Sequence, residues 1–114
     1  MAQEITFRTM LEVAGRPKEH VESSIKEYIQ QMKDSSQFEV ISEDFSETEK
    51  HEEQEIWATL AELEVRTNNF TSLIQFCFDY MPAMVEISYP SELSMNASDM
   101  SAFINGLQER LHKV

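Results

Sequence analysis

The sequence predicts an α+β domain in which two helices cover one face of a four-stranded antiparallel sheet and a third helix follows. Apolar residues recur with a two-residue period in some segments and with a helical period in others, which predicts strands alternating with helices. The 114 residues correspond to one domain, 1–114. Hydrophobic residues make up 41% and charged residues 26%, a composition typical of globular proteins.

The N-terminal segment predicts a strand followed by a helix. Residues 4–13 alternate in polarity, which is typical of a half-buried strand. Its inner face comprises Ile5, Phe7, Thr9, Leu11 and Val13. Gly15 and Pro17 end this strand, and a helix then extends to about Asp34. The apolar stripe of that helix comprises Val21, Ile25, Tyr28, Ile29 and Met32.

Two further strands flank an acidic segment. One strand begins near Phe38, and the next covers about residues 56–66. The carboxylates of Glu62 and Glu64 set the register of the latter, because a shift by one residue would bury both. Its inner face then comprises Trp57, Thr59, Ala61, Leu63 and Val65. Between the two strands, residues 43–55 predict an acidic hairpin.

The C-terminal third predicts a helix, a strand and a last helix. Asn68 or Asn69 caps the first of these helices, and a proline ends it. Its stripe comprises Phe70, Leu73, Ile74, Cys77, Phe78 and Met81. A strand over about residues 83–89 turns inward the side chains of Val85, Ile87 and Tyr89. Asn96 and Asp99 then open the last helix with capping-box spacing. Its stripe comprises Met100, Phe103, Ile104, Leu107 and Leu111.

The order of these elements, β-α-β-β-α-β-α, matches the ferredoxin-like βαββαβ sandwich in its first six members. We therefore expect the spatial strand order 4-1-3-2, with two helices on one face of the sheet. The opposite face would display Arg8, Met10, Glu12, Ile41, Ala58, Leu60, Glu62, Met84 and Glu86. Met10, Leu60 and Met84 come from three neighbouring strands, so they should form a contiguous apolar patch.

An apolar patch of this kind predicts an interface. Either the last helix folds back over the sheet and gives a monomer, or a second copy of the chain covers it. We expect a homodimer, acting as a non-enzymatic module for protein interaction or for small-ligand sensing. The expected interface residues are Met10, Leu60, Met84, Met100, Phe103, Ile104 and Leu107.

The charge of the chain excludes some partners. Nine Lys and Arg against 21 Asp and Glu give a net charge of −12. This charge repels phosphate groups, so we expect neither direct nucleic-acid binding nor binding to an anionic membrane. It would steer a basic protein partner towards the chain, which leaves open a role as the acidic subunit of a larger complex. A single cysteine, no signal-peptide pattern and no long apolar run predict a cytoplasmic protein.

The acidic segment offers the strongest metal-ligand candidates. In an extended hairpin, Glu47, Glu49, His51 and Glu53 would share one side and could offer oxygen and imidazole ligands. The alternative is a solvated hairpin whose charge protects an edge strand from sheet-to-sheet association. We favour the second interpretation, because no calcium-loop spacing is present. We therefore predict no metal site here.

Other catalytic signals are weak. The chain carries no phosphate loop, dinucleotide fingerprint, nucleophile elbow or HExxH motif, so we predict no cofactor and no catalytic residue. Cys77 lies on an apolar stripe between two phenylalanines, which is typical of a small buried side chain. The alternative is a small metal-dependent or carboxylate-based enzyme that uses Glu12, Glu62 and Glu86.

Three segments carry a family resemblance. Trp57 to Val65, Phe70 to Tyr80 and Val85 to Leu93, with the helix that follows, resemble the C-terminal extension of WYL-domain transcriptional regulators. The resemblance implies a ferredoxin-like module that takes part in assembly and ligand response. The chain contains neither a helix-turn-helix nor a WYL domain, so DNA binding and the regulators' ligand site are not implied, and no functional residue is transferred.

Overall fold

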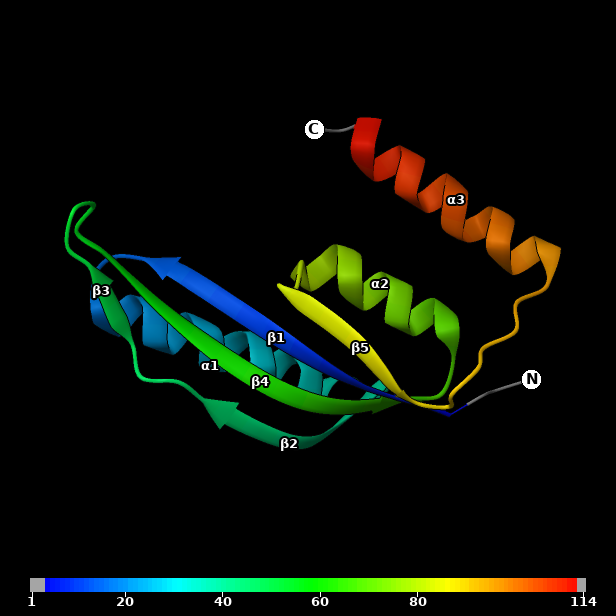
Figure 1. Cartoon of the computed structure of the whole chain (residues 1–114), viewed down its shortest axis with the longest axis horizontal. Coiled ribbons are helices and arrows are strands. Elements are labelled where there is room, and N and C mark those ends of the chain that lie inside the picture. The colour runs from blue at the N-terminus through cyan, green and yellow to red at the C-terminus, as the bar shows by residue number, and fades with distance from the viewer. Residues whose placement is uncertain (1–3, 113–114) are drawn as a thin grey trace.

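A computed structural model describes residues 4–112 and shows an α+β architecture with a five-stranded antiparallel sheet and three helices (Figure 1). In chain order the elements are β1 (Ile5–Gly15), α1 (Lys18–Asp34), β2 (Phe38–Phe45), β3 (Glu49–His51), β4 (Ile56–Thr67), α2 (Phe70–Tyr80), β5 (Met84–Tyr89) and α3 (Ala97–His112).

The long strands β1 and β4 form the centre of the sheet. The spatial order is β2-β4-β1-β5, which is the order predicted for the four longer strands. The prediction of four strands is wrong, because β3 forms a further ladder with the start of β4. In this ladder Lys50 is opposite Trp57, and its ammonium lies 5.9 Å from the centre of the indole ring. Three residues of the segment predicted as a solvated acidic hairpin therefore belong to the sheet.

The core lies between the sheet and the helices α1 and α2. Its buried members are Ile5, Phe7, Leu11, Ile25, Ile29, Met32, Ala61, Leu63, Val65, Leu73 and Phe76. The alternation predicted for β1 and β4 is therefore confirmed at these positions. Thr9 is also buried, and its hydroxyl donates a hydrogen bond of 2.7 Å to the carbonyl oxygen of Met84. The ring of Phe76 lies 5.3 Å from that of Phe7 and 5.8 Å from that of Phe38.

Helix α2 is held by a cap at each end. The side chain of Asn69 accepts a 2.7 Å hydrogen bond from the backbone N–H of Ser72, which confirms the predicted cap. At the other end Met81 adopts the left-handed conformation, with φ of 47°, and its N–H donates to the carbonyl of Cys77. Pro82 follows and cannot continue the helix.

The predicted inward face of β5 is only partly buried. Val85 packs against the core, and Ile87 is opposite Phe7 in the β1–β5 ladder, so both lie on the helix-covered side. However, Ile87 and Tyr89 are exposed, contrary to expectation. Ile87 is exposed because β5 is an edge strand, whereas α1 and α2 pack mainly over β1, β4 and β2. For Tyr89 the register shifts between Thr6 and Phe7, so that Tyr89 pairs with Thr6 and leaves the predicted alternation.

Helix α3 lies on the outer side of α2 and not on the open face of the sheet (Figure 1). Leu73 and Phe76 of α2 are buried towards the sheet, whereas Phe70, Ile74 and Phe78 line the gap between α2 and α3. The molecule is therefore layered locally as sheet, α2 and α3. The alternative in which the last helix covers the sheet is wrong, because the second apolar side of α2 binds α3 instead.

Candidate functional site

The structure brings together the three residues of the apolar patch predicted on the open face of the sheet. Met10 and Met84 are direct cross-strand partners, and Leu60 is diagonal to Met10, since its own partner is Glu12. All three side chains are half-buried by their neighbours. Ile41 sits where the β2–β4 register shifts by a bulge, and it is exposed at the β2 edge. The patch is thus small and lies among charged side chains.

Charge dominates the rest of this open face. Arg8 forms an ion pair and hydrogen bond with Glu62. These two interactions, with smaller contributions from Glu86 and Glu64, raise the pKa of Arg8 above its ordinary value. Arg66 pairs with two further carboxylates, Glu4 at 3.2 Å and Glu39 at 2.9 Å. The carboxylates that the ladders place on this face are Glu12, Glu39, Asp44, Glu62, Glu64 and Glu86.

An excess of carboxylates over arginines makes this face a poor surface for a second copy. Two such faces packed together would bring carboxylates against carboxylates in a setting with little water. The carboxylates of the enzyme alternative are among them: Glu12 and Glu86 are exposed, and Glu62 is paired with Arg8. The structure therefore does not gather these three into a recessed site.

Helix α3 carries a second apolar surface. Met100, Ile104, Leu107 and Leu111 are 40% to 66% exposed, and none of the described residues of α3 is buried. We call these four residues the α3 seam. They are spaced by four, three and four residues, which is the a/d spacing of a helix that packs against another helix. Phe103, also expected at the interface, instead lines the gap towards α2.

The positions that flank the α3 seam carry no carboxylate. Ser101 and Gln108 lie on one side of it, and Phe103 and Arg110 lie on the other. The sheet-face patch and the α3 seam belong to different layers of the molecule, because α3 lies beyond α2 (Figure 1). The structure thus does not bring the seven expected interface residues into one surface.

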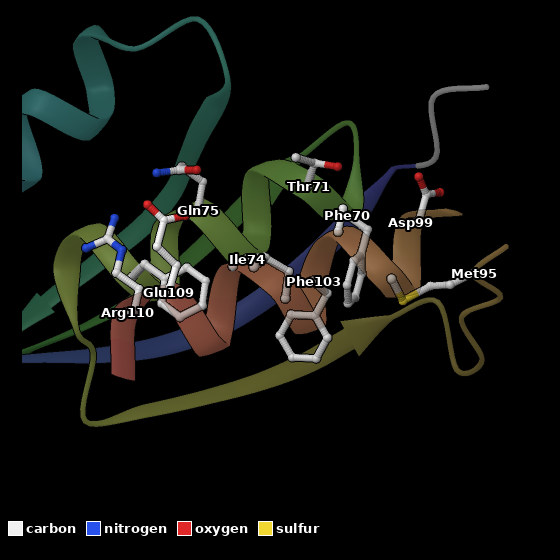
Figure 2. Close-up of a pocket in the computed structure, with 12 residues that line it drawn as sticks. Phe70, Thr71, Ile74, Gln75, Met95, Asp99, Phe103, Glu109 and Arg110 are labelled. Carbon is white, nitrogen blue, oxygen red and sulfur yellow. The ribbon is translucent and has the colours of Figure 1, made fainter. Parts of the chain in front are cut away.

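A pocket of about 370 Å³ lies between α2 and α3 (Figure 2). Its apolar lining comprises Phe70, Ile74, Phe78, Met95, Ala102 and Phe103. In Figure 2, Met95 and Asp99 lie at one end, and Gln75, Glu109 and Arg110 lie at the other. Arg110 is 3.3 Å from the carboxylate of Asp79, and its guanidinium lies 5.2 Å from the ring centre of Phe78.

This pocket is not predicted by the periodicity of the sequence, although two signals point towards it. Helix α2 is apolar on more than one side, as Phe70, Leu73 and Phe78 show together, so it can bind neighbours on opposite faces. In addition, Gly106 interrupts the interior of α3. Neither signal says which element lies opposite, because that depends on the path of residues 90–96.

The acidic segment does not form a ligand set. Glu49 and His51 belong to β3, whereas Glu47 and Glu53 lie outside it, and all four are exposed. Over residues 4–112 the structure shows no group of three His, Cys, Asp or Glu side chains placed to hold a metal ion. Thr48 ties the segment to α1 through a 2.7 Å hydrogen bond that its hydroxyl donates to Glu22.

Cys77 is half-buried beside the core, close to the buried position that the sequence predicts. Its partial burial raises the pKa of the thiol, since the thiolate is poorly solvated there. Burial, with a smaller contribution from Asp79, likewise raises the pKa of the neighbouring Tyr80. A thiol kept protonated in this way is a weak nucleophile.

Together, the fold and these surfaces define an α+β protein with a charged open sheet face, an exposed helical seam and a pocket between helices. A family model matches residues 6–114, and the chain belongs to the MJ0538 family. The chain matches no curated protein and no solved structure. None of the helices within residues 4–112 has the length and apolar character needed to cross a bilayer.

Proposed function

We propose that this chain is a non-enzymatic interaction module that forms a homodimer through the α3 seam. The observation that carries the proposal is a 16-residue amphipathic helix that buries none of its described residues and exposes four apolar side chains in a row. Apolar surface exposed to water is unfavourable, and the free energy falls when a matching surface covers it.

A second copy of α3 suits the seam better than a basic partner does. The a/d spacing is self-complementary, and its flanks hold no carboxylate in a chain with a net charge of −12. Two copies can therefore meet there without placing like charges opposite each other. A basic protein would instead be attracted to the carboxylates of the open sheet face and of residues 43–55, which lie outside the seam.

The proposal has three further parts. We infer that the fold is ferredoxin-like, which the order β2-β4-β1-β5 and the placement of α1 and α2 over the same core support. The resemblance to the C-terminal extension of WYL-domain regulators is proposed with it. A cytoplasmic location is supported by the free thiol of Cys77, which suits a reducing compartment.

Sedimentation velocity on two matched variants tests the dimer. We expect the unmodified chain to sediment at twice its 13.3 kDa mass at micromolar concentration. Leu107→Glu places a carboxylate in the seam and should give the monomer, whereas Asn105→Glu adds the same charge on the polar side and should leave the dimer intact. A monomeric unmodified chain, or equal behaviour of the two variants, would refute the proposal.

A further inference from the structure

We propose that the pocket between α2 and α3 binds a small molecule that carries one aromatic ring and a positive charge, such as an arylalkyl amine. The pocket is formed within one chain, so this proposal does not depend on the homodimer. It assigns a ligand class to a site whose lining contains none of the four α3 seam residues and no residue of the sheet.

The apolar lining suits a flat ring. Phe70, Phe78 and Phe103 contribute three aromatic rings to the lining. Ile74 and Met95 add further apolar surface (Figure 2). Aromatic rings bind other rings edge-to-face or offset, and their faces attract cations. The volume of about 370 Å³ lies within the range of small-molecule sites.

Gly106 helps to keep the pocket open. A glycine inside a helix is less favourable than alanine by about 1 kcal/mol. Nothing steric requires it here, because a Cβ atom at this position would meet the ring of Phe78 at 3.6 Å, an ordinary contact. A larger side chain would extend from the α3 backbone towards Phe78 and fill the space between the helices.

Charge decides between a cationic and an anionic ligand. Arg110 is the single cation among the residues that line the pocket, and Asp79 already pairs with it. At the opposite end, the carboxylate of Asp99 forms no ion pair with any residue between 4 and 112. An ammonium group near Asp99, with its ring among the phenylalanines, would match both parts of the pocket.

Three probes with the same ring test the inference: 2-phenylethylamine, 2-phenylethanol and phenylacetate, each titrated while the methyl resonances of Ile74 and Met95 are followed by NMR. We expect the amine to bind with a Kd of roughly 0.1–1 mM, as small ligands do. The alcohol should bind more weakly by about fivefold or more, and phenylacetate weakest. No shift at either methyl group, or equal shifts with all three probes, would overturn the proposal.

Variants locate the binding and separate it from the dimer. Gly106→Leu should reduce amine affinity by about tenfold or more because it fills the pocket, whereas Gly106→Ala should retain binding. Asp99→Asn should lower the affinity for the amine but leave the affinity for the alcohol unchanged. A change in folding would lower both affinities. The monomeric Leu107→Glu variant should bind the amine with the affinity of the unmodified chain. Loss of amine binding in Leu107→Glu would contradict the proposed site. So would an Asp99→Asn variant that still binds the amine more tightly than the alcohol by the original ratio.

Discussion

Helices α1 and α3 have nearly the same length, 17 and 16 residues, and each carries an apolar stripe at helical spacing. Their surroundings nevertheless differ completely. Four members of the predicted α1 stripe, Val21, Ile25, Ile29 and Met32, are at most 2% exposed, whereas the α3 seam is at least 40% exposed. The fifth member, Tyr28, is predicted on the apolar side but is 46% exposed. Periodicity thus identifies the apolar side of a helix but does not identify what covers it.

The order of the chain explains the difference. Helix α1 follows β1 directly and packs on the sheet, where α2 later completes the cover. Helix α3 follows β5 and packs on the outer side of α2, so it makes no substantial contact with the sheet. Phe103 and Gly106 face α2 in that contact, whereas the four residues of the α3 seam do not line the gap and stay exposed.

The largest difference is expected when the same substitution, isoleucine to alanine, is made in both helices. Ile25→Ala should lower the free energy of unfolding by about 2–5 kcal/mol, because it leaves a cavity in the core. Ile104→Ala should change it by no more than about 0.5 kcal/mol in the monomer, since Ile104 is 45% exposed and does not belong to the core. Urea unfolding at low protein concentration measures both. Similar losses for the two variants would show that α3 is part of the core.

Removal of α3 should have a smaller effect. A chain of residues 1–96 keeps every buried member of the core, so it should still unfold cooperatively. It exposes Phe70, Ile74 and Phe78, and we expect a loss of about 1–3 kcal/mol from that partly covered surface. Calorimetry and circular dichroism would measure the loss. If the chain of residues 1–96 were unfolded, α3 would stabilise α2 far more than its position on the outer side of α2 suggests.

The two asparagine caps provide a finer comparison. Asn69 accepts the N–H of Ser72 at 2.7 Å, and Asn96 accepts the N–H of Asp99 at 2.8 Å. Asn69→Ala should cost about 1 kcal/mol of global stability, because α2 is part of the cooperative core. Asn96→Ala should reduce hydrogen-exchange protection in α3 alone and leave the global free energy of unfolding unchanged. A global loss of equal size in both would contradict the separation of α3 from the core.

Much of the fold is readable from the sequence, because long alternating strands determine their own register. The carboxylates of Glu62 and Glu64 correctly place Leu63 and Val65 in the core. The three residues of β3 are too few to produce a pattern, so their ladder with residues 56–58 of β4 could not be predicted. The pocket could not be predicted, since it depends on how α3 packs against α2, which periodicity does not determine.

Cys77 provides the smallest predicted effect, at the boundary of the core on α2. Burial raises the pKa of its thiol, so less thiolate is present at a given pH than in an exposed cysteine. Labelling by a thiol reagent in the folded chain should therefore reach half its maximal rate at a higher pH than in the same chain unfolded in urea. The raised pKa of the thiol also contributes to the stability of the fold. This contribution is fully present at a pH below the ordinary thiol pKa, and it is lost as the pH rises through the pKa of Cys77 in the folded chain. Coincident labelling profiles for folded and unfolded chains would show that Cys77 is solvated, and that the boundary between the core and the outer layer lies closer to the sheet than we infer.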